Sequence, residues 1–203
     1  SLHRAAAAGE EHHVHLGMVY QRPSGFLTES LHQVENPGWQ SRLLETLHYP
    51  LAHQGRLLRG LEDHGVASTK VTDADGGKAN LVATIGAQVD GGIVLSGHTD
   101  VVPVDGQDWQ TAPFTLTRKG GQLFGRGSSD MKGFIACALA AVPDLVAAKL
   151  TRPVHLAFSY DEEVGCFGVH GIVDLFDAEG FKPAICLVGE PTMMHVANAH
   201  KGA

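Results

Sequence analysis

Acidic side chains and one histidine follow three apolar, strand-like segments of this chain. The segments IVLSG, VHLAFSY and ICLVG are followed in turn by His98-Thr99-Asp100, Asp161-Glu162-Glu163 and Glu190. A further acid, Asp130, ends the glycine-containing stretch GRGSSD. Ligands of open α/β sheets bind beyond the carboxyl ends of the strands, so we expect these side chains to meet at one sheet edge. Carboxylates can crowd there only with raised pKa values or bound cations, which favours a divalent metal.

The His98-Thr99-Asp100 motif could supply a metal ligand together with its hydrogen-bond partner. Residues i and i+2 of a strand point to the same face, so His98 and Asp100 would lie on one side. A metal-binding histidine usually donates its second ring N–H to a carboxylate. An HxD sequence is common by chance, so the metal interpretation depends on the acids at the other strand ends.

Glu162 and Glu163 are neighbours, and on an extended chain their side chains point in different directions. One could bind a metal while the other transfers protons. Paired acids are also common in solvated turns, but these follow an apolar strand and precede a glycine-containing loop, which favours a site. Glu190 repeats the arrangement after LVG, and the glycines before Asp130 permit unusual backbone geometry.

The elements that would position these residues alternate between helix and strand. Residues 41–65 show a leucine-rich helical pattern that Pro50 divides. Two more helices are expected at 132–148 and 168–180. Strands are expected at 66–71, 80–86, 93–97, 114–117, 154–160 and 185–189. This alternation predicts an α/β fold with a mostly parallel central sheet and helices on both faces.

Residues 1–40 form an N-terminal segment that the sequence leaves poorly readable. The segment includes His12, His13 and His15 and shows no sustained strand or helix period. Such a cluster could bind a metal, but a solvated tail is the commoner outcome for a polar end segment. No linker divides residues 41–203, so we expect them to belong to one domain.

Composition and charge argue against two classes of protein, those that bind nucleic acid and those that span or bind membranes. A chain of 203 residues fits one domain, and its formal net charge of −7 argues against nucleic acid or an anionic membrane as the main partner. No apolar run reaches the roughly 18–20 residues needed to span a bilayer. Three cysteines without CxxC spacing, Cys137, Cys166 and Cys186, indicate a reducing, cytoplasmic setting. Their apolar neighbours predict buried, inert thiols.

Four motifs together resemble the M20 family of dinuclear zinc amidohydrolases and peptidases. They occur in the family's order, as GHTDVVP at 97–103, GRGSSDMKG at 125–133, DEEVGC at 161–166 and GEPT at 189–192. The resemblance covers roughly residues 65–203, and the wording is most similar to the acetylornithine deacetylase branch. It implies a zinc-peptidase-like catalytic domain.

The resemblance also implies two zinc ions, with Co²⁺ as a possible substitute, and a role for each site residue. Asp130 would bridge the ions, while His98 and Glu190 would complete one site and Glu163 would bind the other. Glu162 would act as general base and acid, and Asp100 would orient His98. The peptide bond that follows Asp130 would be cis.

The implied activity is hydrolysis of the amide of an N-acyl amino acid. In this branch the substrate would be N2-acetylornithine, cleaved to ornithine and acetate in arginine biosynthesis by a cytoplasmic homodimer. Two alternatives stay open. The substrate could be succinyl-diaminopimelate or another N-acyl amino acid or peptide, or the chain could be a metal-binding fragment without catalysis.

The chain departs from the family pattern at its C-terminal end. Family members are nearly twice as long, because a dimerisation domain follows the HKG-type strand end near Ala203 and the catalytic sheet then resumes. The second metal's histidine would lie in that absent part, and neither His195 nor His200 matches its position. We therefore expect residues 41–203 to be the N-terminal part of a catalytic domain that alone binds about one zinc tightly and is inactive.

Overall fold

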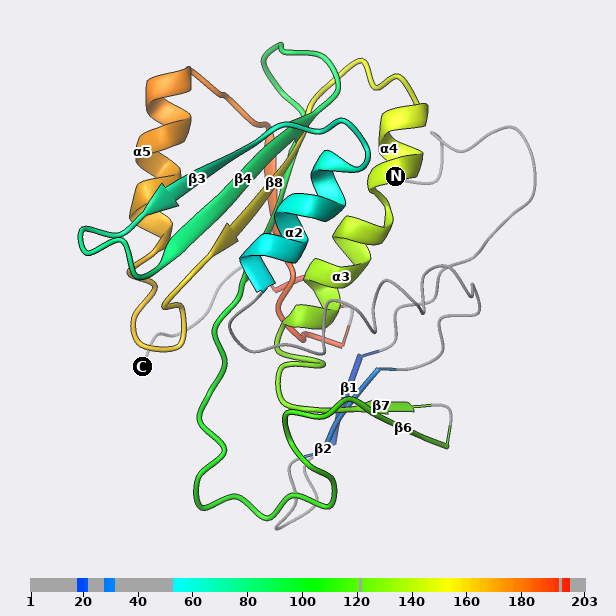
Figure 1. The fold of residues 1–203 in the computed structure, drawn as a ribbon. Helices are drawn as coiled ribbons and strands as arrows, with labels where there is room; N and C mark the ends of the chain where they lie inside the picture. Colours follow the sequence, from blue (N-terminus) through cyan, green and yellow to red (C-terminus); the bar gives the residue numbers. More distant parts are fainter. Residues whose placement is uncertain (1–17, 22–27, 32–52, 121, 194, 198–203) are drawn as a thin grey trace.

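The structure is a computed structural model that describes residues 18–21, 28–31, 53–120, 122–193 and 195–197. The expected helix before Pro50 and the histidines at 12, 13 and 15 lie outside these residues. Two sheets and the helices packed on the larger one make up the described part (Figure 1).

The larger sheet has five strands in the order β3-β4-β8-β5-β9. These are β3 (Ser68–Thr72), β4 (Ala79–Ile85), β8 (Val154–Ser159), β5 (Ile93–His98) and β9 (Ile185–Val188). Strands β8, β5 and β9 are parallel, whereas β4 is antiparallel to both β3 and β8, so only β4 runs against the other four. The predicted mostly parallel α/β sheet is confirmed.

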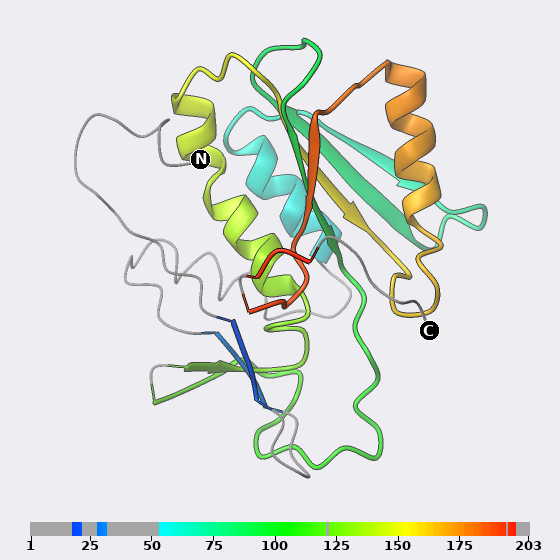
Figure 2. The same cartoon turned by 180° about the vertical axis from the view of Figure 1, so that it is seen from behind.

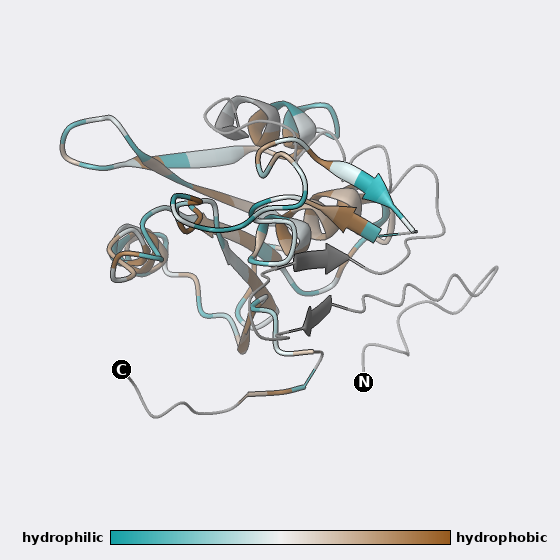
Figure 3. Cartoon of the chain, turned by 90° about the horizontal axis from the view of Figure 1, so that it is seen from below, coloured by the Kyte–Doolittle hydropathy of each residue, from teal (hydrophilic) through white to brown (hydrophobic). Residues whose placement is uncertain are grey.

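Helices cover both faces of this sheet, as Figures 1 and 2 show. They are α2 (His53–Glu62), α3 (Lys132–Ala140) and α4 (Val142–Ala147) on one face and α5 (Val169–Glu179) on the other. Along β8, Leu156 and Phe158 pack in the cluster formed with α2 and α3, while Ala157 packs with α5. This alternation is the two-residue period of a strand buried on both sides. Figure 3 shows the chain from below, with apolar and polar segments interspersed along it.

The helices predicted at 132–148 and 168–180 are confirmed, but their ends differ from the predicted ones. The helix expected at 132–148 is divided at Ala141 into α3 and α4, because Pro143 has no N–H to continue the helical ladder. Helix α5 ends at Gly180, which adopts the left-handed conformation with φ of 69° that favours glycine.

A second, antiparallel sheet has the strand order β1-β2-β7-β6. Its strands are β1 (Met18–Gln21), β2 (Thr28–Leu31), β7 (Gln122–Phe124) and β6 (Thr117–Lys119). A solvated tail is therefore wrong for the two N-terminal strands. The strand expected at 114–117 is also misplaced, because the N–H of Thr115 donates to the carbonyl of Ala112 in a turn, and β6 begins only at Thr117.

The predicted burial of all three cysteines is wrong for two of them. Cys166 and Cys186 are exposed, and Cys137 is half-buried in α3, where burial raises its pKa to about 12. Cys186 is exposed because it lies in β9, an edge strand whose four residues are all exposed. Among the described helices, none combines the length and apolar character needed to cross a bilayer.

Candidate metal centre

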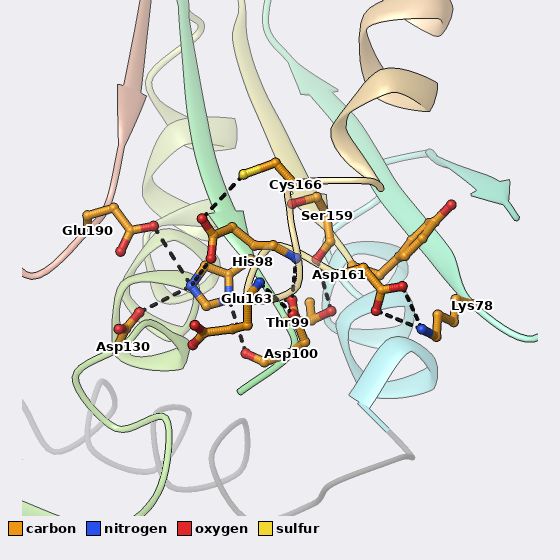
Figure 4. A network of polar contacts seen from close by, with 12 residues as sticks. Lys78, His98, Thr99, Asp100, Asp130, Ser159, Asp161, Glu163, Cys166 and Glu190 are labelled. Atoms are coloured by element: carbon orange, nitrogen blue, oxygen red, sulfur yellow. Dashed lines mark hydrogen bonds and ion pairs between the residues drawn. The ribbon is translucent and has the colours of Figure 1, made fainter. Parts of the chain in front are cut away.

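The predicted site residues gather at one edge of the larger sheet (Figure 4). His98 is the last residue of β5, and both the N–H and the hydroxyl of Thr99 donate to the carbonyl of Ser159, which aligns the ends of β5 and β8. Gly189 extends the ladder from β9 by donating its N–H to Ser96 at 3.0 Å. Glu190 is thereby held next to the end of β5.

Two groups of side chains at this edge have the geometry of cation sites. His98, Asp130 and Glu190 offer ligand atoms within 4.8 Å of one another, and so do His98, Glu162 and Glu163. The Nε2 atom of His98 is 3.1 Å from an oxygen of Asp130, 3.8 Å from Glu190 and 3.9 Å from Glu162. The structure thus brings four of the predicted acids close to the imidazole of His98. These acids are Asp130, Glu162, Glu163 and Glu190.

Asp100 contacts both His98 and the backbone of Glu162 and Glu163, and so links the end of β5 to the loop that follows β8. The Nδ1 atom of His98 is 3.0 Å from the main-chain carbonyl of Asp100 and 3.5 Å from its carboxylate. Nδ1 therefore faces two acceptors and carries the proton, which leaves Nε2 to face the acids. The carboxylate also accepts the N–H groups of Glu162 and Glu163 at 3.1 and 3.0 Å. Burial would raise the pKa of Asp100, but these contacts lower it to about 2.

The site carries an excess of negative charge. Burial favours neutral His98, but hydrogen bonds that its ring donates to Asp100 and Asp130, together with the charge of Glu190, raise the pKa of His98 to about 10. Burial and the charge of Asp130 raise the pKa of Glu190 to about 7. The same two causes raise the pKa of Glu163. Bound protons therefore offset part of the negative charge of these side chains. A divalent cation would neutralise that charge more fully.

The residues present fit divalent cations. Oε1 of Glu163 is buried and has no hydrogen-bond partner among the described residues, although a buried carboxylate oxygen normally has one. One imidazole nitrogen and several carboxylate oxygens form a donor set that suits zinc and neighbouring transition metals. His195 belongs to neither group of candidate ligands, and His200 lies outside the described residues.

Cation affinity should rise with pH. Binding at the position of His98 and Glu190 must displace the proton of His98 below about pH 10 and that of Glu190 below about pH 7. We expect zinc affinity to rise about tenfold per pH unit between pH 7 and 9, and more steeply below pH 7. Calorimetry in buffers of different ionisation enthalpy should show about one proton released per tightly bound zinc at pH 8. Affinity that does not change with pH would contradict this charge distribution.

Gly189 packs closely against Phe134 and directly precedes Glu190. A Cβ atom added at Gly189 would lie 2.0 Å from Cγ of the Phe134 ring. We expect Gly189→Ala to displace Glu190 and to weaken cation binding at the position of His98, Asp130 and Glu190 about tenfold. The substitution should also destabilise the fold by about 1–3 kcal/mol. Zinc titration and thermal unfolding measure both effects.

Gly60→Ala is the matched control for this substitution. No atom lies within 4 Å of a Cβ added at Gly60 in α2, so its cation affinity should equal that of the unchanged chain. Restoration of affinity in a Gly189→Ala, Phe134→Ala double variant would identify the clash as the cause. Full affinity in Gly189→Ala alone would show that the contact does not position Glu190.

Three contacts at the site involve residues for which the sequence suggested no role. The thiol of Cys166 donates to Oε1 of Glu162 at 3.4 Å. Lys78 pairs with Asp161, and buried Asn80 bonds to the loop that follows β8. Cys166 lies within the DEEVGC motif, which could have directed attention to it. The peptide bond between Asp130 and Met131 is cis, as predicted.

Comparison with known proteins agrees with this geometry. The model of peptidase family M20/M25/M40 matches residues 94–201. Acetylornithine deacetylase of Proteus mirabilis (strain HI4320) is 42% identical over 127 residues, covering 62% of this chain and 32% of that protein. The enzyme of the same name from Pasteurella multocida (strain Pm70) is 41% identical over 125 residues, with the same coverage. The chain thus spans about a third of the length of these curated relatives.

Solved structures share the fold. An M20 family metallo-carboxypeptidase from Sulfolobus solfataricus superposes with a TM-score of 0.65 at 23% identity, over 76% of this chain and 37% of that one. Human carnosine dipeptidase 1 gives a TM-score of 0.61 at 22% identity, over 74% and 37%. Because the family model matches more than half of the chain's residues, the chain belongs to peptidase family M20/M25/M40.

Proposed function

We propose that this chain forms part of a metal-dependent amidohydrolase that removes the acetyl group from N2-acetylornithine. The observation that carries the proposal is the ring of Asp130, Glu162, Glu163 and Glu190 around His98 at the carboxyl ends of parallel strands. The similarity to acetylornithine deacetylases supports the choice of substrate.

His98, Asp130 and Glu190 would hold one divalent cation, and Asp130 with Glu163 would hold a second. We propose zinc, and Co²⁺ suits the same donors. When bound, such cations polarise an amide carbonyl and lower the pKa of water. With three protein ligands against two among the described residues, the first position should bind its cation more tightly.

Glu162 would transfer the protons. Its carboxylate shares the space in front of Nε2 of His98, and the thiol of Cys166 donates to one of its oxygens. That position suits a general base that removes a proton from the attacking water and then protonates the departing amine. Asp100 would hold His98 in one orientation while anchoring the N–H groups of Glu162 and Glu163.

The proposal is tested by measuring release of ornithine from N2-acetylornithine. The protein is expressed from its complete coding sequence, loaded with zinc, and the 203 residues are assayed beside it. Ornithine release that stops on chelation and returns with zinc supports the proposal. Faster turnover of succinyl-diaminopimelate or another N-acyl amino acid would reassign the substrate. Zinc binding without turnover of any of these compounds would favour a non-catalytic metal-binding protein.

The proposed enzyme acts on a small molecule in arginine biosynthesis, as a homodimer in the cytoplasm. The absence of disulfide pairing among Cys137, Cys166 and Cys186 suits a reducing compartment. Sedimentation of the protein expressed from the complete coding sequence should give the mass of a dimer. A monomer with full activity would contradict that part of the proposal.

A further inference from the structure

The loop at residues 160–168 carries Glu162 and Glu163, and the start of β4 lies against it. Strands β4 and β8 are antiparallel, with Leu81 opposite Phe158. The first residues of β4 are therefore neighbours of the residues that leave β8. Lys78 and Asn80 occur at this point, and neither belongs to the proposed cation ligands.

Asn80 binds both ends of this loop. Its side chain is 1% exposed, its Nδ2 donates to the carbonyl of Gly168 at 2.7 Å, and its Oδ1 accepts the N–H of Tyr160 at 3.3 Å. The N–H of Gly168 also donates to the carbonyl of Tyr160 at 3.2 Å. A Cβ atom at Gly168 would lie 2.2 Å from that carbonyl oxygen, so the two ends of the loop are in direct contact.

Lys78 holds the loop at a second point, visible in Figure 4. Its ammonium contacts both carboxylate oxygens of Asp161, at 2.7 and 2.5 Å. Asp161 has a φ of 55°, a conformation in which a non-glycine residue needs support from its surroundings. Because Lys78 is at the surface, its pairing should contribute less than the buried bonds of Asn80.

The other proposed ligands lie on other elements, and Asp100 is the residue that contacts both His98 and this loop. His98 ends β5, Asp130 precedes α3 and Glu190 follows β9. Among the described residues, no hydrogen bond or ion pair of Asn80 or Lys78 reaches these three. We infer that Asn80, assisted by Lys78, is a positioning residue for Glu162 and Glu163. It acts on the second cation position and not on the first. This inference rests on the proposed function.

Zinc titration of single variants separates the two positions. Asn80→Ala removes the partner of the Tyr160 N–H and one of the two hydrogen bonds to the carbonyl of Gly168, which also accepts the N–H of Gly171. We therefore expect the weaker binding event to lose about tenfold in affinity. Lys78→Met should weaken the same event about two- to threefold, and Lys78→Arg should restore it. The tighter event should stay within about twofold in all three variants.

Two control variants match these changes. Thr84→Ala removes the 2.9 Å bond between Thr84 and His155 near the other end of β4, and Lys70→Met removes an exposed lysine from β3. Both controls should bind zinc as the unchanged chain does. Circular dichroism establishes that each variant is folded, and Lys78→Met serves if Asn80→Ala does not fold.

Amide hydrogen exchange without zinc provides a second readout. Asn80→Ala should speed exchange in residues 160–168 about tenfold and leave residues 125–133, which carry Asp130, unchanged. Equal loss of both zinc-binding events, or faster exchange throughout the chain, would show that Asn80 only stabilises the fold. Unchanged exchange and affinity would show that the loop needs no such support. An unchanged chain that binds no zinc would instead overturn the proposed function, while the exchange result would still decide the role of Asn80.

Discussion

Asp130→Asn should remove zinc binding from both cation positions. Asp130 is the proposed shared ligand, its carboxylate oxygen lies 3.1 Å from Nε2 of His98, and its charge raises the pKa of Glu190 and Glu163. Asparagine keeps the shape but loses the anionic charge that offsets two cations. We expect affinity to fall more than about a hundredfold at each position, beyond the 10–100-fold typical of residues that only support a ligand. Calorimetry and metal content after dialysis measure the change.

Asp75→Asn is the control for this loss of charge. Asp75 lies in the exposed turn between β3 and β4, so its substitution should leave both affinities unchanged. Loss of only one binding event in Asp130→Asn would show that the carboxylate serves one cation. Loss of neither would overturn the assignment of the site.

Glu162→Gln should abolish most of the hydrolysis while zinc stays bound. Glutamine cannot accept and return a proton, and general acid–base catalysis contributes about 10²–10⁴-fold to a rate. We therefore expect kcat for N2-acetylornithine to fall by about that factor in the protein expressed from its complete coding sequence. Zinc content should stay the same, because Glu162 is not among the proposed ligands.

Glu179→Gln provides the matched control. Glu179 ends α5 and is exposed, away from the metal centre, so kcat should not change. A Glu162→Gln variant with more than a tenth of the original kcat would assign proton transfer to another group. A variant that loses its zinc would make Glu162 a ligand instead.

The sequence was sufficient to predict where these side chains gather, because most of them follow strands directly. His98, Glu163 and Glu190 each stand at or just beyond the end of a strand, and β5, β8 and β9 are parallel, so the ends meet at one edge. Apolar segments of this length between glycine-containing loops are a strong signal for a central strand. No strand leads directly to Asp130, so only its motif indicated that it would lie near His98 and Glu190.

What the sequence left out depends on contacts between distant segments. Asn80 meets Tyr160 and Gly168 only because β4 is antiparallel to β8, and no local pattern reveals that pairing. The four-residue strands β1 and β2 are too short to show a period. Cys186 was expected to be buried because apolar neighbours do not distinguish an edge strand from a central one.

Strand β9 is an exposed, apolar edge strand of the described part of the larger sheet. Ile185, Leu187 and Val188 expose 56, 39 and 59% of their surface, and in the described part of the chain β9 has a partner strand on one side only. Its free row of N–H and C=O groups can accept a further strand, and the apolar side chains favour that addition. We therefore expect this edge to favour pairing between chains in concentrated solution, against the repulsion of the net negative charge. Leu187→Lys should reduce this association, because a charge on an edge strand discourages pairing without disturbing the neighbouring core.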